Sequence, residues 1–189
     1  ANQISQLSGR YHAGSMSVRS AQAMQVGTVD NVVGIAGTGS GSLALESAGL
    51  LTVNQDVATA SGAASLKGSG ITLASGKTLS GGSVSLDGLG TGALALGAGT
   101  VSAPSVSLTN ATAATLGNIT ASTGLGITNM SGAVGQQAST SVSAGLLTGS
   151  GNTAAINLGA SGNQFTGIGT LSTSAGGITV LDSTSGSTN

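Results

Sequence analysis

The chain has 189 residues, of which 34 are glycine and only two, one tyrosine and one phenylalanine, are aromatic. Without tryptophan it cannot build the aromatic-filled core of an ordinary globular domain, so any core consists of leucine, isoleucine and valine. Four basic and five acidic residues give a net charge of −1, which removes the electrostatic basis for binding nucleic acids or anionic membranes.

The composition excludes further classes of protein. The absence of cysteine rules out a disulfide scaffold, thiolate zinc sites and cysteine nucleophiles. No apolar run is long enough to cross a bilayer, so we expect no helix inserted in a membrane. The chain begins at Ala1 without methionine or a basic-then-apolar leader, and we therefore expect a processed or excised piece of a longer product.

Residues 1–15 contain few paired apolar residues, and we expect a cap, a frayed end or the tail of a preceding turn. They hold Arg10, Tyr11 and His12, the only cluster whose chemistry would suit a ligand. Such a triplet near a terminus is more often simply exposed to solvent. It therefore carries no site assignment at this stage.

From residue 16 onward, apolar residues alternate with small ones, which is the pattern of a strand with one buried face. Glycine, serine or asparagine separates nearly all of these short motifs. The motifs are Met16-Ser17-Val18, Leu43-Ala44-Leu45, Leu51-Thr52-Val53, Ile71-Thr72-Leu73, Val84-Ser85-Leu86, Leu94-Ala95-Leu96, Val106-Ser107-Leu108, Leu125-Gly126-Ile127, Ile156-Asn157-Leu158 and Ile178-Thr179-Val180.

The motifs recur with a period of about 20 residues, which indicates a repeat architecture. Nearly even steps of this length connect Leu43, Ala64, Val84, Val106 and Leu125. After Gly124 the spacing of the motifs becomes uneven, and we expect changed turn lengths or missing strands there. The uneven members are Leu125, Val142, Ile156 and Ile178.

A meander of hairpins would need a two-residue reversal at each connection, and only Asp87-Gly88 has that chemistry. The alternative is an all-β parallel β-helix, or β-solenoid, with about 20 residues and three short strands per turn, each pairing with the next turn about 4.8 Å away. We expect about eight to nine turns over residues 16–181 and a polar linker or tail over residues 182–189. The residues expected to point inward include Leu43, Leu45, Leu66, Ile71, Leu73, Val84, Leu86, Val106 and Leu108.

Charged residues give an independent check on this register. Four of them directly follow the second inward residue of a motif, so they fall in one outward column with alternating signs, provided that the first turn is longer than the others. Lys67 is expected to reach the carboxylates on both sides, and Asp56 with Lys77 forms a second pair. Each exposed pair contributes about 0.2 to 1 kcal/mol at most. The column, here called the charge ladder, consists of Arg19, Glu46, Lys67 and Asp87.

Two stretches, Ser42–Asn54 and Gly70–Leu79, resemble the shaft repeats of the filamentous haemagglutinin family, which are large exoproteins of Gram-negative bacteria. The resemblance covers residues 16–181 in pattern and composition. It implies a right-handed parallel β-helix, secretion to the cell surface by a two-partner route, and work as an adhesin or biofilm fibre. The asparagine-rich secretion domain of that family is not visible in this sequence.

Catalysis would have to rely on one histidine and five carboxylates. Glu46 and Asp87, two turns apart, would stand about 9.6 Å from each other, close to the separation in an inverting glycosidase. However, Lys67 lies between them, and an exposed ladder lacks the burial that separates the pKa values of two carboxyl groups. We therefore expect no enzyme, no catalytic residue, no cofactor and no metal site.

Binding hot spots draw on Trp, Tyr and Arg, and this chain has one Tyr, two Arg and no Trp. The expected function is a structural shaft segment of a secreted bacterial surface adhesin, with adjoining repeats as its partners and host contacts made by regions outside this chain. One alternative is a self-assembling subunit of an extracellular filament or biofilm matrix, because a solenoid without caps exposes strand edges that pair end to end. The other is a β-helical carbohydrate-active enzyme.

Overall fold

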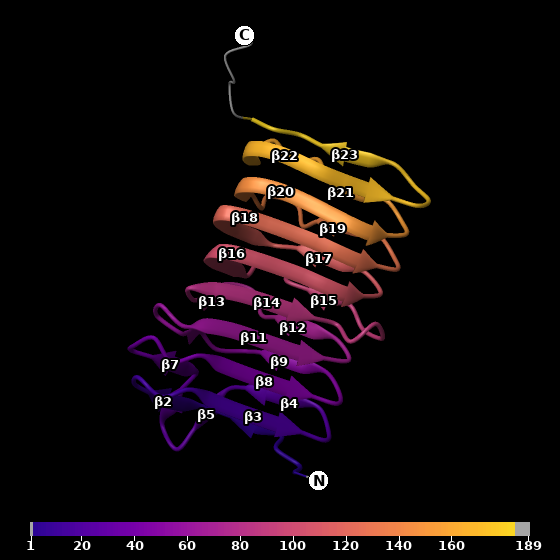
Figure 1. Ribbon diagram of the computed structural model, residues 1–189. Helices are drawn as coiled ribbons and strands as arrows, with labels where there is room; N and C mark the ends of the chain where they lie inside the picture. Colours follow the sequence, from indigo (N-terminus) through magenta and orange to yellow (C-terminus); the bar gives the residue numbers. More distant parts are fainter. Residues whose placement is uncertain (1, 184–189) are drawn as a thin grey trace.

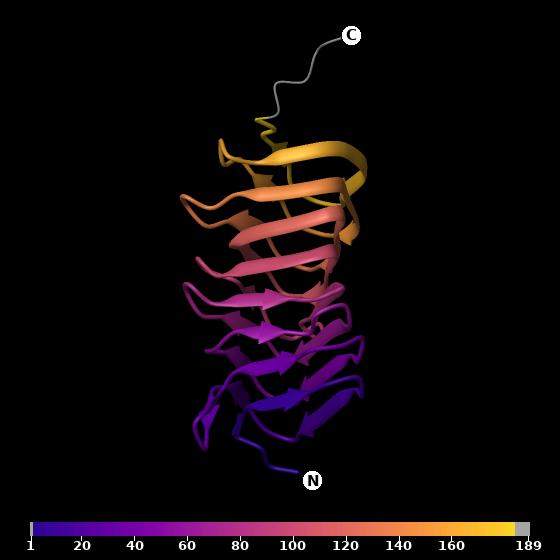
Figure 2. The same ribbon diagram turned by 90° about the vertical axis from the view of Figure 1, so that its left-hand side faces the viewer.

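The computed structural model describes residues 2–183, and this part of the chain contains strands and turns but no helix. The chain climbs from the N-terminus to the C-terminus in stacked coils (Figures 1 and 2). The predicted fold, an all-β, right-handed parallel β-solenoid, is confirmed, with about eight coils. Because no helix is present among the described residues, none spans a membrane.

Each coil contributes one strand segment to each of three faces, and all pairing between coils is parallel. The first face contains β3 (Met16–Ser20), β8 (Leu43–Ser47), β11 (Ala63–Gly68) and β14 (Ser83–Asp87). The second face contains β1 (Gln6–Leu7), β4 (Met24–Val26), β9 (Leu51–Val53), β12 (Ile71–Leu73), β15 (Leu94–Ala95), β17 (Ala114–Leu116), β19 (Val134–Gln136), β21 (Ile156–Leu158) and β23 (Ile178–Val180). The third face contains β2 (Gly9–Tyr11), β7 (Ile35–Gly37), β10 (Val57–Ala58) and β13 (Thr78–Ser80).

In the upper coils, single long strands run from the third face onto the first. The long strands are β16 (Thr100–Ala111), β18 (Asn118–Met130), β20 (Val142–Asn152) and β22 (Gln164–Thr173). The pairing register shifts where they turn the corner, between Ala103 and Ser105 in β16 and between Ala121 and Gly124 in β18. Such irregularities bend a strand without ending it, so the corner needs no separate turn.

The repeat continues to the last described coil. Leu125 pairs with Leu147, and Leu147 pairs with Ile168, so the period is still about 20 residues in these coils. The strands expected to be missing after Gly124 are therefore present, although the pairing of β20 with β22 does shift register between Leu147 and Gly149 and between Gly149 and Asn152. The motif spacing looked uneven because Leu125 lies on the first face, Val142 on the third, and Ile156 and Ile178 on the second, so the intervals compared strands of different faces.

The core is a set of apolar columns that run along the axis of the rod. All nine residues predicted to point inward are buried, and the most exposed of them, Leu73, has only 3% of its surface accessible. Between them, outward positions carry small polar residues, for example Ser65 paired with Ser85 on the next coil. Burial of one such Leu, Ile or Val side chain contributes about 1.5 to 3 kcal/mol, and the contribution recurs on every coil.

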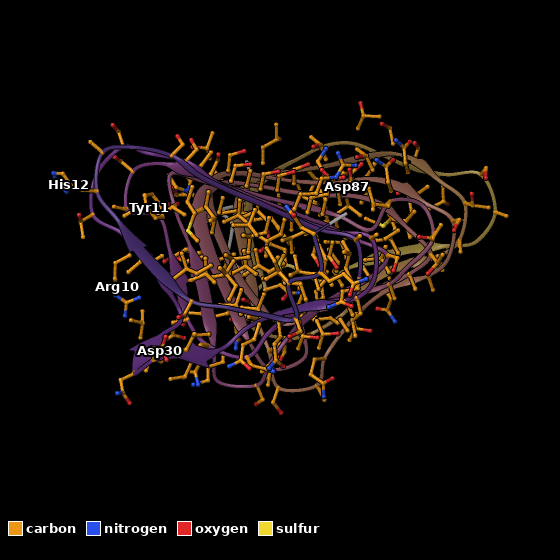
Figure 3. The ribbon with its side chains drawn as sticks, turned by 90° about the horizontal axis from the view of Figure 1, so that it is seen from below. Arg10, Tyr11, His12, Asp30 and Asp87 are labelled. Carbon is orange, nitrogen blue, oxygen red and sulfur yellow. The ribbon has the colours of Figure 1, made fainter. Side chains whose placement is uncertain are left out.

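The first coil is longer than the others, as the charge ladder required, because it carries an insertion. Met16 pairs with Leu43 across this long coil. Its excess over a regular coil equals the length of an antiparallel hairpin, β5 (Thr28–Val29) and β6 (Val32–Val33) with its turn. The turn residues Asp30 and Asn31 have φ values of 48° and 64°, which suits the tight turn of a two-residue hairpin loop. The hairpin projects from the N-terminal end of the rod, where Figure 3 labels Asp30.

We expect deletion of residues 28–33 to leave the solenoid folded, because the neck of the hairpin is already closed. Gly34 N–H donates a hydrogen bond to the Gly27 carbonyl at 2.9 Å, so the two ends can be joined into a coil of regular length. The melting temperature, followed by circular dichroism, should change by only a few degrees. Deletion of residues 94–99, a segment of the same length, removes the buried Leu94 and Leu96 and should unfold the protein; equal losses in both variants would contradict this account.

The two ends of the described chain close onto the solenoid differently. Near the N-terminus, β1 and β2 pair with β4 and β7, so residues 6–11 supply the second and third faces of the lowest coil. Near the C-terminus, Phe165 N–H donates to Asp182 Oδ1 at 3.2 Å, and Ser183 Oγ donates to the Asn163 carbonyl at 2.6 Å. Residues 184–189 of the predicted linker lie outside the described residues.

Candidate functional site

The structure places the four residues of the charge ladder on consecutive coils of the first face. Arg19 pairs in register with Glu46, Glu46 with Lys67, and Lys67 with Asp87. This follows from the alternation of each strand, because the preceding residue in each case belongs to an inward column. The lower coils thus present positive and negative side chains in strict alternation along one outward column.

The ladder consists of two ion pairs rather than a continuous chain. Arg19 Nη2 lies 2.9 Å from Glu46 Oε1, and Lys67 Nζ lies 4.0 Å from Asp87 Oδ2. Lys67 lies between Glu46 and Asp87 on neighbouring coils, as expected, but among the described residues its ion pair is with Asp87 and not with Glu46. Glu46 is engaged by Arg19 on the coil below. Both pairs are at least partly exposed, and each contributes about 0.2 to 1 kcal/mol at most.

Asp87 has a second role at the end of its strand. Its Oδ1 atom accepts a hydrogen bond from Leu89 N–H at 2.9 Å, the arrangement by which an aspartate supports a turn two residues onward. Leu89 has a φ of 54°, a left-handed conformation that the side-chain bond helps to hold. The Asp87 side chain is accordingly the less exposed partner of its ion pair, at 14%.

The second predicted charge pair, Asp56 with Lys77, is not an ion pair. Lys77 Nζ donates to Gln55 Oε1 at 3.0 Å, and Asp56 Oδ1 accepts from Thr78 N–H at 2.8 Å. Both residues lie at the same corner of neighbouring coils, but the pairing there joins residues 22 apart, as Val57 with Leu79, whereas Asp56 and Lys77 are 21 apart. The Asp56 carboxylate therefore meets the Thr78 amide of the next coil, and Lys77 meets Gln55.

Arg10, Tyr11 and His12 do not converge on a common ligand position. The Arg10 guanidinium donates to the carbonyls of Val33 at 2.8 Å and Gly34 at 3.3 Å, which fastens the hairpin neck. The Tyr11 ring lies inward against Gly37, its hydroxyl is buried without a hydrogen-bond partner among the described residues, and burial raises its pKa. Figure 3 shows Arg10 and His12 on the outer surface and Tyr11 further in.

The described residues contain no group of three or more His, Asp or Glu side chains that could hold a metal ion. Glu46 and Asp87, the two carboxylates considered for glycoside hydrolysis, are already bonded, Glu46 to Arg19 and Asp87 to Lys67 and the Leu89 amide. A glycosidase needs one carboxyl group that stays protonated and a second that stays ionised beside the substrate.

A buried polar network in the upper coils was missed by the sequence reasoning. Asn163 is fully buried; its Oδ1 accepts from Gln136 Nε2 at 2.7 Å and from Val142 N–H at 2.8 Å. Its Nδ2 donates to Gln136 Oε1 and to the Leu158 carbonyl, both at 2.9 Å. An asparagine in a Gly-Ser-rich stretch looks like an ordinary turn residue, so no local signal distinguishes it.

The C-terminal coil leaves its apolar columns uncovered by other described residues. Ile156 is fully buried, whereas its partner on the next coil, Ile178, is 41% exposed. On the first face, Leu147 is buried and its partner Ile168 is 52% exposed. The described end of the rod therefore presents apolar side chains together with the edges of parallel strands.

Comparison with known proteins gives no assignment, because no family model, curated protein or solved structure matches the chain. The residues and the geometry described above are therefore the basis for inferring its function.

Proposed function

We propose that the chain is a structural shaft segment of a secreted bacterial surface adhesin or fibre. The observation that supports this proposal most directly is the stack itself, in which the coils between the two ends repeat the same buried columns and all coils pair in parallel. From the first to the last coil of the first face there are seven intervals, which span about 34 Å. A stack of this kind holds an attached region of the protein at a fixed distance from the base of the rod.

The surface of the upper coils also suits a spacer rather than a recognition site. No Lys, Arg, Asp, Glu or His occurs between Gly88 and Leu181, and the aromatic residue there, Phe165, is buried. Arginine and exposed aromatic rings supply most binding hot spots, so we assign host contacts to regions outside this chain. Placement at the surface of a Gram-negative bacterium rests on the resemblance of Ser42–Asn54 and Gly70–Leu79 to shaft repeats.

Removal of one whole coil tests the spacer function. In a solenoid each coil contacts only its neighbours. Deletion of residues 106–124 joins Ser105 directly to Leu125, and Leu125 then takes the position in the column that Val106 holds in the intact chain. We expect a folded rod shorter by about 4.8 Å, measured by small-angle scattering. Cells producing the full-length protein with this deletion should adhere as before.

The matched control removes half a coil, residues 106–115, which shifts every later apolar residue away from its column and should abolish folding and adhesion. Direct binding of the isolated chain to host cells, or loss of adhesion on removal of residues 106–124 with surface display intact, would contradict the shaft proposal.

A second candidate, a self-assembling filament subunit, is favoured by the exposed Ile168 and Ile178 at the C-terminal coil. Open strand edges with apolar columns are templates for end-to-end pairing. Electron microscopy of the concentrated chain distinguishes the candidates, because a subunit grows into filaments of unlimited length, whereas a shaft segment stays a short rod.

A further inference from the structure

When the four residues of the charge ladder are taken in reverse order, the charge at every position has the opposite sign. In chain order the signs are positive at Arg19, negative at Glu46, positive at Lys67 and negative at Asp87. We propose that two copies of this chain pair side by side, antiparallel, through the charge ladders of their first faces. A two-fold axis between the coils of Glu46 and Lys67 sets Arg19 opposite Asp87 of the second copy, and Glu46 opposite its Lys67.

The geometry of the first face permits this approach. The four charges sit on consecutive coils, so their spacing of about 4.8 Å is the same in both copies and all four positions align together. Stacked sheets lie about 10 Å apart, a gap that arginine and lysine side chains can span. The neighbouring outward column consists of small residues, and a shallow groove follows the ladder, lined among others by Ser17, Arg19, Ala44, Glu46, Ser65 and Lys67.

The cations of the ladder have hydrogen-bonding capacity to spare. The Arg19 side chain is 78% exposed although it contacts Glu46, and the Lys67 side chain is 48% exposed with its ion-pair partner 4.0 Å away. A guanidinium has five N–H donors and an ammonium has three. Pairing between copies therefore adds contacts to the ladder without breaking those that each copy already makes.

Other alignments satisfy fewer charges. Two parallel copies in register set like charges opposite each other at every position. Parallel copies offset by one coil match three positions and leave Arg19 of one copy and Asp87 of the other unmatched. The antiparallel arrangement matches all four positions and closes as a dimer, because both copies use the same surface.

The area involved sets the strength of the association. Four coils of one face bury much less than the roughly 1,200 Å² of the smallest stable complexes. The dimer is therefore weak, weakened further by salt because its charges are screened, and populated at high concentration. The pairing itself concerns the isolated chain and does not depend on the proposed shaft function.

Two charge swaps that leave the net charge unchanged test the arrangement by sedimentation equilibrium at low salt. The double change Lys67→Glu/Asp87→Lys keeps unlike charges in both ion pairs within one copy, at positions 19 and 46 and at positions 67 and 87. Across the two-fold axis, however, it makes each residue of the ladder face a residue of the same charge in the second copy. Dimerisation should weaken about tenfold or more. The double change Glu46→Lys/Lys67→Glu sets like charges on neighbouring coils yet keeps opposite charges across the axis, so its dimer should match that of the unmodified chain.

Cysteine crosslinking gives a second measurement that leaves the charges untouched, since the chain has no cysteine of its own. In the antiparallel dimer Ser65 faces Ala44 of the second copy. A mixture of the Ala44→Cys and Ser65→Cys variants should therefore form mainly the mixed disulfide dimer, identified by mass spectrometry.

The proposal is overturned by an unmodified chain that stays monomeric into the millimolar range at low salt, or by a dimer that survives the Lys67→Glu/Asp87→Lys change. Loss of the dimer in a folded Glu46→Lys/Lys67→Glu variant would also overturn it in favour of the offset parallel pair. Filaments that grow equally from all variants would assign association to the ends of the rod instead.

Discussion

Replacement of Leu66 by aspartate should unfold the middle coils of the solenoid. Leu66 is fully buried and lies between Leu45 and Leu86 in one inward column. A carboxylate there would have no partner, and burial of an unpaired charge costs at least several kcal/mol, which is comparable with the roughly 5 to 15 kcal/mol that stabilises a typical domain. Circular dichroism should show loss of the β signal or a melting temperature lower by tens of degrees.

The neighbouring residue provides the control for this change. Ser65 occupies the outward position of the same strand, so Ser65→Asp should alter the free energy of unfolding by about 0.5 kcal/mol or less. If Leu66→Asp were as stable as Ser65→Asp, the inward assignment of the column would be wrong.

Replacement of Asn163 by leucine should cost about 3 kcal/mol or more, although the two side chains are similar in size. The change removes all four hydrogen bonds of the buried amide and leaves the Gln136 amide, Val142 N–H and the Leu158 carbonyl without these partners. Each buried polar group left unsatisfied costs about 1 to 3 kcal/mol. Urea denaturation should show the loss as a lower midpoint, and amide exchange at Val142 should accelerate.

The matched variant is Asn157→Leu, the same substitution at the exposed outward position of β21. It should change the free energy of unfolding by about 0.5 kcal/mol or less. Equal losses in the two variants would show that the Asn163 network contributes nothing beyond side-chain size.

The repeat and its buried face could be derived from the sequence because both depend on local pattern. Side chains alternate between the two faces of a strand, and an interval of about 20 residues returns the chain to the same face. These two rules were enough to place Leu43, Leu66 and Val84 in the core. They also placed Arg19 beside Glu46 across a coil of unusual length.

The same rules could not assign the later motifs to faces, because all three faces carry the same apolar-small-apolar pattern. Leu125 and Ile156 look alike in sequence, and only the pairing of neighbouring coils separates them. The corners inside β16 and β18 are likewise invisible locally, since a register shift is a property of two strands together.

Sequence alone thus determined the solenoid class, the period, the inward columns and the order of charges along the ladder, since each follows from spacing along one chain. Tertiary structure decided which partner each polar group takes. Lys67 bonds to Asp87 and not Glu46, Asp56 bonds to a backbone amide and not Lys77, and Asn163 gathers four hydrogen bonds. The physical reason is that a hydrogen bond or ion pair depends on distances of a few tenths of an ångström between coils, whereas the burial of an apolar side chain depends only on which face it occupies.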